Sequence, residues 1–204
     1  MLQRLTRQFS GPRGPLGYVA GFLMSRMNVQ LNQWAVDLME LGPFDRICEI
    51  GFGPGLAVEL AASRATSGFV AGVDLSEVML AQASRRNRAA IAAGRVELRC
   101  GTAAELPFAD ASFTRACAVN SLQFWPEPEA GIREIHRVLS PGGRLVLALR
   151  MRRTDVGRYS RSRFGFTEKR AVAVRQMLEK TGFTPSATTR EIRGETIRAL
   201  VGRR

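Results

Sequence analysis

The stretch from Glu49 to Gly55 places an acid before three glycines at alternate positions, Gly51, Gly53 and Gly55. Glycine has no Cβ, so its backbone adopts positive φ angles and approaches a ligand closely. The spacing differs from the dinucleotide fingerprint G-x-G-x-x-G. A pyrophosphate binds at the positive end of a helix, and an acid directly before the turn opposes that binding. The pattern therefore favours a cationic ligand.

Asp74 stands 19 residues after Gly55, at the end of the next apolar segment. An acid at this place accepts hydrogen bonds from both hydroxyls of a ribose. Nicotinamide enzymes share that feature, so Asp74 indicates adenosine without distinguishing the cofactor. Two further turns, at residues 101–108 and 120–125, follow later apolar segments. We expect all these turns to meet at one sheet edge.

Apolar strand-like segments alternate with helical patterns through the middle of the chain. The expected strands are residues 46–50, 69–73, 96–99, 114–119 and 144–149. The expected helices are residues 56–64, 76–92 and 128–139. Ser76 is the expected N-cap of the second helix, and a Pro-Gly-Gly turn at 141–143 precedes the last strand. This alternation implies βαβ units and a mostly parallel α/β sheet with both faces covered.

Both ends of the chain depart from this alternation. An amphipathic helix is expected from about Gly21 to Leu41, after a stretch rich in glycine and proline. Near the C-terminus, Thr167 is expected to cap a helix, and strands at 186–192 and 196–201 to form a hairpin with one antiparallel strand. We therefore divide the chain into an N-terminal extension or lid (1–41) and one domain (42–204).

Four motifs in this order resemble those of the class I S-adenosylmethionine-dependent methyltransferases. The branch they resemble most contains the ubiquinone/menaquinone biosynthesis C-methyltransferases, and the resemblance covers about residues 42–150. It implies a Rossmann-like doubly wound sheet of about seven strands whose last strand is antiparallel. It also implies S-adenosylmethionine as methyl donor and S-adenosylhomocysteine as product. The motifs are Cys48–Gly55, Gly72–Ser76, Gly101–Phe108 and Glu134–Gly143.

The resemblance also assigns residues to the methionine part of the cofactor. Gly51 and Gly53, with the neighbouring backbone up to Gly55, would hold this part, and Glu49 beneath the turn would orient it. Asn120 stands where the family contacts the methionine amine. Alternatively, Glu49 is only an N-cap-like or structural acid.

The resemblance assigns a second set of residues to the adenosine part of the cofactor. Asp74 would bind the ribose, and the segment containing Leu75 and Met79 would pack on the adenine. Thr102 stands where many relatives carry an aspartate that binds the adenine amino group. A threonine lacks that charge, so recognition would rest more on the backbone of Ala103. Alternatively, Thr102 is only a turn residue.

The methyl acceptor is less well defined by the sequence. Relatives often have a histidine where this chain has Gln123, so no general base is assigned. We expect the extension and the loops after the fourth and fifth strands to form the acceptor site, with an apolar or aromatic small molecule as substrate. The extension would act as a lid or make a shallow membrane contact. The positioning candidates are Tyr18, Asn28, Gln123 and Tyr159, and further lining candidates are Phe22, Met27, Trp34, Phe124, Trp125 and Arg150.

The net charge of +12 raises a nucleic-acid methyltransferase as an alternative. Residues 150–204 carry 15 basic and 5 acidic side chains, a net charge of +10, whereas residues 1–149 carry +2. Against this alternative, the segment from Asn120 to Gln123 lacks the Asn-Pro-Pro-aromatic motif of amino-methylating enzymes, and no RNA-binding module is evident. A non-catalytic S-adenosylmethionine-binding protein is a second alternative, and a nicotinamide enzyme is disfavoured by the glycine spacing.

The cysteines and the apolar runs bear on metal binding and localisation. Cys48, Cys100 and Cys117 have no paired spacing, so neither a zinc site nor a disulfide framework is expected. The run Leu16–Met24 has nine residues, whereas a membrane span needs about 20. We expect a cytoplasmic enzyme without a metal.

Overall fold

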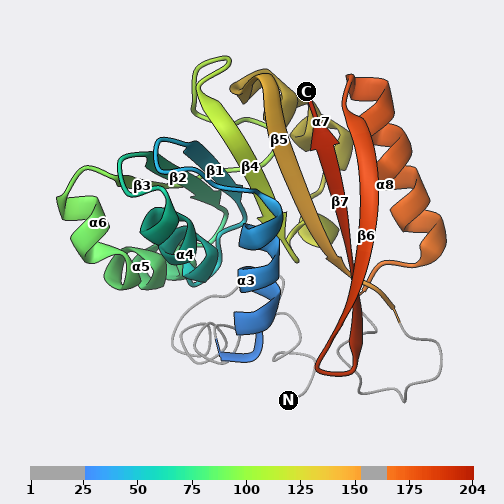
Figure 1. The fold of residues 1–204 in the computed structure, drawn as a ribbon, viewed down its shortest axis with the longest axis horizontal. Coiled ribbons are helices and arrows are strands. Elements are labelled where there is room, and N and C mark those ends of the chain that lie inside the picture. The colour runs from blue at the N-terminus through green and yellow to red at the C-terminus, as the bar shows by residue number, and fades with distance from the viewer. Residues whose placement is uncertain (1–25, 153–164) are drawn as a thin grey trace.

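A single seven-stranded sheet forms the centre of the computed structural model, which describes residues 26–152 and 165–204 (Figure 1). The strand order is β3-β2-β1-β4-β5-β7-β6. The first five strands in this order are mutually parallel, and β7 runs antiparallel to both of its neighbours. This confirms the Rossmann-like fold and its antiparallel last strand. The strands are β1 (Arg46–Ile50), β2 (Phe69–Asp74), β3 (Val96–Cys100), β4 (Phe113–Val119), β5 (Leu139–Arg150), β6 (Thr184–Ile192) and β7 (Glu195–Arg203).

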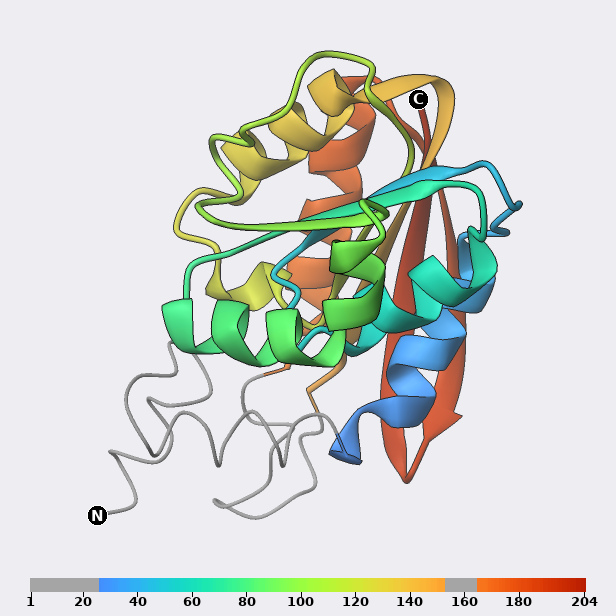
Figure 2. The ribbon, with the colours of Figure 1, turned by 90° about the vertical axis from the view of Figure 1, so that its left-hand side faces the viewer.

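Helices cover both faces of this sheet (Figure 2). Alternate residues of β1 show the division: Ile47 packs with α3, α4 and α5, whereas Cys48 and Ile50 pack with α7 and α8. The doubly wound arrangement is therefore confirmed. The helices are α3 (Val29–Leu38), α4 (Leu56–Arg64), α5 (Glu77–Arg86), α6 (Arg88–Ala92), η1 (Leu122–Phe124, a 3₁₀ turn), α7 (Pro128–Val138) and α8 (Glu168–Thr181).

The helix expected over residues 76–92 is broken at Asn87. Ser76 caps its start as predicted, accepting a hydrogen bond from the Met79 amide at 3.3 Å. The buried Asn87 side chain donates to the carbonyls of Gly55 (3.1 Å) and Ala83 (2.9 Å). The residue that interrupts the helix thus ties α5 to the glycine turn.

The C-terminal hairpin forms as predicted, with longer strands. Arg193 and Gly194 connect β6 and β7, and both have positive φ (53° and 75°), as a type I′ turn requires. The Pro-Gly-Gly segment at 141–143 is expected as a turn before the strand, but it lies within β5. The pairing of β5 with β4 is irregular there. The glycines of this segment pair with Arg204, so the chain end holds it in the sheet.

Helix α3 lies within the amphipathic helix predicted from about Gly21 to Leu41, ends three residues before the predicted end, and belongs to the core. Residues 21–25 of that prediction lie outside the described residues. The buried residues of α3, Leu31, Trp34, Ala35 and Val36, join the cluster that covers one face of the sheet. This packing brings Asn28 and Asn32 to the carboxyl edge of the strands. No helix among residues 26–152 and 165–204 is long and apolar enough to cross a membrane.

Candidate cofactor site

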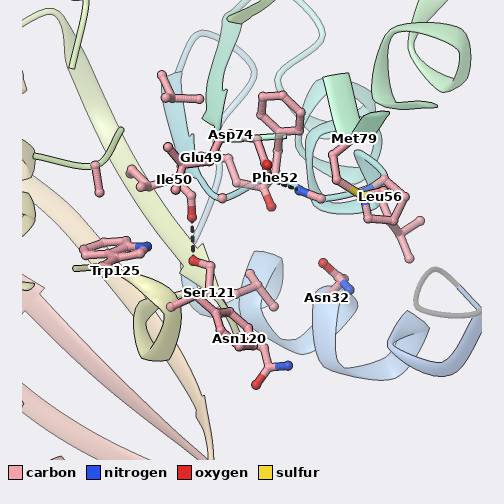
Figure 3. Close-up of a pocket in the computed structure, with 18 of the residues that line it drawn as sticks. Asn32, Glu49, Ile50, Phe52, Leu56, Asp74, Met79, Asn120, Ser121 and Trp125 are labelled. Carbon is pink, nitrogen blue, oxygen red and sulfur yellow. Dashed lines mark hydrogen bonds between the residues drawn. The ribbon is translucent and has the colours of Figure 1, made fainter. Parts of the chain in front are cut away.

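A pocket lies at the carboxyl ends of β1, β2 and β4, where the expected turns meet (Figure 3). Two carboxylates, of Glu49 and Asp74, lie on one side, and three amides, of Asn28, Asn32 and Asn120, line it as well. None of the described residues that line the pocket is a lysine, an arginine or a histidine. The charged groups of the described lining are therefore all acidic.

The backbone amides of the glycine turn are used within the protein. The amide of Gly51 donates to the Val73 carbonyl (2.7 Å), and that of Gly55 donates to the Phe52 carbonyl (2.9 Å). The Gly53 amide donates to Oδ2 of Asp74 at 2.8 Å. Phosphate-binding loops instead direct several free amides at the ligand. The turn is consequently poorly suited to a pyrophosphate.

The three glycines are required for different reasons. All have positive φ, 77° at Gly51, 51° at Gly53 and 77° at Gly55. A Cβ at Gly51 would lie 2.5 Å from Cβ of Ser121, and one at Gly55 would lie 2.7 Å from Cβ of Ala83. A Cβ at Gly53 would meet nothing within 4 Å, because Gly53 borders the open pocket. Gly51 and Gly55 allow close packing, whereas Gly53 gives the ligand access to the backbone.

Glu49 is a buried acid that lines the pocket and contacts the first turn of α4. Its side chain is buried, at 2% exposure, and its carboxylate accepts a hydrogen bond from the Val58 amide in the first turn of α4. Oε2 has no hydrogen-bond partner among the described residues. Burial, and secondarily the nearby charge of Asp74, raise the pKa of Glu49 well above its ordinary value. A buried acid with an unused oxygen at a ligand pocket is a site for a cation or a hydrogen-bond donor.

Asp74 is anchored by the backbone on both sides. Oδ2 accepts from the Gly53 amide and Oδ1 from the Ser76 amide (2.9 Å). Burial raises the pKa of Asp74, and these two hydrogen bonds oppose the rise. A carboxylate has about four acceptor positions, so two remain for the hydroxyls of a ribose.

Asn120 ends β4 in a left-handed conformation with φ of 52°. Its amide donates to the Ala148 carbonyl (2.8 Å), and its carbonyl and Oδ1 both accept from Nε2 of Gln123, at 2.9 and 3.1 Å. Gln123 itself does not line the pocket but fixes Asn120, which does. Next to it, the Ser121 hydroxyl donates to the Ile50 carbonyl (2.7 Å) and joins β4 to β1 (Figure 3).

Apolar side chains occupy two ends of the pocket. Met79 is buried and Leu75 is exposed beside Asp74, where an adenine would follow the ribose. Phe124 and Trp125 line the pocket as well, and Figure 3 shows Trp125 on the side opposite Met79. A Cβ at Gly131 would lie only 2.7 Å from Cε3 of Trp125. The lack of a side chain at Gly131 therefore makes room for the Trp125 ring.

The structure brings together at this pocket nine of the residues predicted to bind the cofactor or to position the acceptor. Gly55 and Thr102 do not line it: Gly55 packs on α5, and Thr102 is exposed in a short bridge to Glu105. Tyr18, Phe22 and Tyr159 lie outside the described residues. Of the other lining candidates, Phe124 and Trp125 line the pocket, whereas Met27 is exposed and Trp34 is buried in the core. Asn32 and Ser121 line the pocket and were not predicted, although Asn32 is one helical turn after Asn28. The nine are Asn28, Glu49, Gly51, Gly53, Asp74, Leu75, Met79, Ala103 and Asn120.

Comparison with known proteins decides the family. Residues 48–147 match the family model described as a methyltransferase domain. An uncharacterized methyltransferase, YdaC, of Bacillus subtilis (strain 168) is 31% identical over 147 residues, which are 72% of this chain and 79% of the relative. The chain belongs to the class I S-adenosylmethionine-dependent methyltransferases. Its methyl donor is S-adenosylmethionine.

Other proteins are similar to this methyltransferase either in sequence over about half of their own length or in fold at low sequence identity. The ubiquinone/menaquinone biosynthesis C-methyltransferase UbiE of Geotalea daltonii is 31% identical over 116 residues, 56% of this chain and 49% of the relative. The chain thus spans about half the length of that protein. A SAM-dependent methyltransferase from Aquifex aeolicus has a TM-score of 0.71 at 17% identity, covering 87% of this chain and 92% of that one.

The pocket fits the donor of this methyltransferase. S-adenosylmethionine carries a sulfonium and an ammonium group, and the described lining contributes two carboxylates and no basic side chain. The unused Oε2 of Glu49 provides an acceptor for the ammonium group. The two free acceptor positions of Asp74 match the two ribose hydroxyls.

Proposed function

We propose that this methyltransferase transfers the methyl group to a small apolar or aromatic molecule that binds beside Phe124 and Trp125. The observation that carries the proposal is the position of Trp125, at the side of the pocket opposite the adenine-side residue Met79 (Figure 3). An acceptor in contact with this ring would lie beyond the methionine part of the donor. Relatives named as ubiquinone/menaquinone and 24-methylenesterol C-methyltransferases support an apolar acceptor.

The chain's own residues position the reactants in this proposal. Glu49 holds the ammonium group, Asp74 holds the ribose, and Leu75 and Met79 flank the adenine. Bound S-adenosylmethionine supplies an electrophilic methyl group on a cationic sulfur. Gln123 keeps Asn120 in its left-handed conformation, so that the end of β4 forms a rigid wall between donor and acceptor. Holding two reactants at the correct distance and angle accounts for much of the catalysis.

Two further expectations stay proposals. We propose that residues 1–41 form an extension to a catalytic domain of residues 42–204, and that Tyr18 and Tyr159 help to position the acceptor. We also propose a cytoplasmic location, which the three free thiols support because disulfides are rare in a reducing compartment.

The test is to incubate the protein with methyl-labelled S-adenosylmethionine and separate metabolite and RNA fractions of cell extract. We expect label in an apolar small molecule, and none with the Asp74→Asn variant. Label in RNA, with binding that weakens steeply as salt rises, would support the nucleic-acid alternative instead. Cofactor binding without transfer to either fraction would support a non-catalytic binding protein.

A further inference from the structure

Arg150 is a buried arginine at the end of β5, next to the pocket but not lining it. Its side chain is 7% exposed and forms an ion pair with Glu195 at the start of β7. Nη2 donates a hydrogen bond to Oδ1 of Asn28 at 3.1 Å. Asn28 does line the pocket. A buried charge is therefore connected to the pocket through one amide.

The hydrogen bond from Arg150 determines which end of the Asn28 side-chain amide is left to face the pocket. A guanidinium has only donors, so it can bind only the amide oxygen. The NH2 group of Asn28 is thereby left for the ligand. Asn32, one turn later, donates from Nδ2 to the Asn28 carbonyl at 2.8 Å and holds the backbone at this point. The start of α3 thus presents a fixed hydrogen-bond donor.

The methionine part of the cofactor needs such a donor. Its carboxylate is anionic, whereas the charged groups of the described lining, Glu49 and Asp74, are acidic. The amides of Gly51, Gly53 and Gly55 are already used within the protein. These three amides are therefore not free for a ligand carboxylate. The described lining offers other side-chain donors, the amides of Asn28, Asn32 and Asn120 and the indole N–H of Trp125, and of these Trp125 lies at the side of the pocket proposed for the acceptor.

We propose that Asn28 binds the carboxylate of the methionine part of S-adenosylmethionine, and that Arg150 is a positioning residue that orients Asn28 for this contact. The inference rests on the placement of the cofactor proposed above. It assigns the start of α3 to the binding of the methyl donor rather than of the methyl acceptor. It also gives the ion pair between buried Arg150 and half-buried Glu195 a role in cofactor recognition.

The substitution Asn28→Asp tests the carboxylate contact. An aspartate can still accept from Arg150, so the variant keeps the fold and its unfolding temperature does not fall. It lacks the NH2 donor and adds a negative charge facing the ligand carboxylate. We expect the Kd for S-adenosylmethionine, measured by calorimetry, to rise by about tenfold or more. The Kd for decarboxylated S-adenosylmethionine should be unchanged or lower.

Gln30→Glu is the matched control, because it makes the same change of charge on an exposed residue of the same helix. It should alter neither Kd by more than about twofold. Equal weakening of both ligands by Asn28→Asp, or weakening of neither, would overturn the role of Asn28. Failure of the wild-type protein to bind S-adenosylmethionine would instead overturn the proposed cofactor placement.

The role of Arg150 is tested by combining Arg150→Lys with Asn28→Ala. A lysine keeps the charge beside Glu195 but not the planar donor that orients Asn28. We expect Arg150→Lys alone to weaken S-adenosylmethionine several-fold and to have no further effect when residue 28 is alanine. Equal losses in both backgrounds would show that Arg150 acts independently of Asn28 and would overturn the positioning role.

Discussion

The pocket has an acid wall, formed by Glu49, Asp74 and the turn between Gly51 and Gly55, and an amide wall, formed by Asn28, Asn32 and Asn120. The acid wall is held by the backbone: amides of the turn and of Ser76 and Val58 bind its carboxylates. The amide wall is held by other side chains, Arg150 and Gln123. The acid wall provides negative charge for the cationic methyl donor. The amide wall provides neutral hydrogen-bond donors with a fixed direction.

The way each wall is built predicts how it responds to substitution. Changes in the acid wall alter backbone conformation as well as ligand contacts, so their effects should be large. Changes in the amide wall remove one hydrogen bond and leave the backbone in place, so their effects should be smaller and specific to part of the ligand.

The largest effect is expected for Gly51→Ala. The new Cβ would overlap Cβ of Ser121 at 2.5 Å, and φ of 77° is unfavourable for alanine. We expect a loss of about 3 kcal/mol of unfolding free energy in chemical denaturation. Gly53→Ala is the control: it meets no atom within 4 Å, so only the conformational cost of about 1 kcal/mol applies. Equal destabilisation by the two variants would contradict the packing role of Gly51.

The next largest effect is expected for Asp74→Asn. An asparagine cannot accept from both the Gly53 and Ser76 amides while still binding a ribose, because it has a single acceptor oxygen. We expect S-adenosylhomocysteine to bind about 100-fold more weakly in calorimetry. A change of less than about threefold would show that the ribose lies elsewhere.

Glu49→Gln separates charge from shape in the acid wall. It should weaken both S-adenosylmethionine and S-adenosylhomocysteine, each by about tenfold, because both ligands carry the ammonium group that Glu49 is proposed to hold. The unliganded variant should be at least as stable as wild type at neutral pH, because it no longer buries a carboxylate. Unchanged binding of both ligands would contradict the contact between Glu49 and the ammonium group.

The same residue predicts a pH dependence of stability. The pKa of Glu49 is raised in the folded protein, so its contribution to stability is complete below the ordinary value of 4.5. That contribution is lost as pH rises through the folded pKa. Thermal unfolding of the unliganded wild type should therefore show a stability loss above pH 4.5 that is reduced in Glu49→Gln. Identical pH profiles would contradict the burial of an ionisable group at this position.

The smallest effect is expected for Asn32→Ala in the amide wall. The variant loses a donor that holds the Asn28 carbonyl, while Arg150 still orients the Asn28 side chain. We expect about a threefold weaker Kd for S-adenosylmethionine and little change in unfolding temperature. A loss as large as that of Asp74→Asn would contradict the difference between the two walls.

The acid wall could be predicted from sequence because it is local. An acid, three glycines and Asp74 lie within 26 residues, and all lie at or soon after the ends of β1 and β2. The amide wall joins Asn28 and Asn32 to Asn120, about 90 residues later, and no spacing rule relates the two parts. Asn32 and Ser121 are close in sequence to the predicted residues Asn28 and Asn120, but the local pattern does not show that their side chains face the pocket.

The errors in the predicted elements have a similar origin. The helical pattern over residues 76–92 carried no sign that the Asn87 side chain would bind the Gly55 carbonyl and break the helix. The Pro-Gly-Gly segment reads locally as a turn, but its pairing with Arg204 at the chain end makes it part of β5. In both cases a contact between distant residues overrides the local signal.

The acidic turn from Glu49 to Gly55, whose glycine amides are not free to bind a phosphate, is proposed to bind S-adenosylmethionine. Thermal unfolding in the presence of ligands tests this binding most directly. Ligands that bind only the folded state raise the unfolding temperature. We expect S-adenosylmethionine and S-adenosylhomocysteine to raise the unfolding temperature, and NAD to leave it unchanged. Stabilisation by NAD, with no response to either sulfur ligand, would contradict the proposed binding.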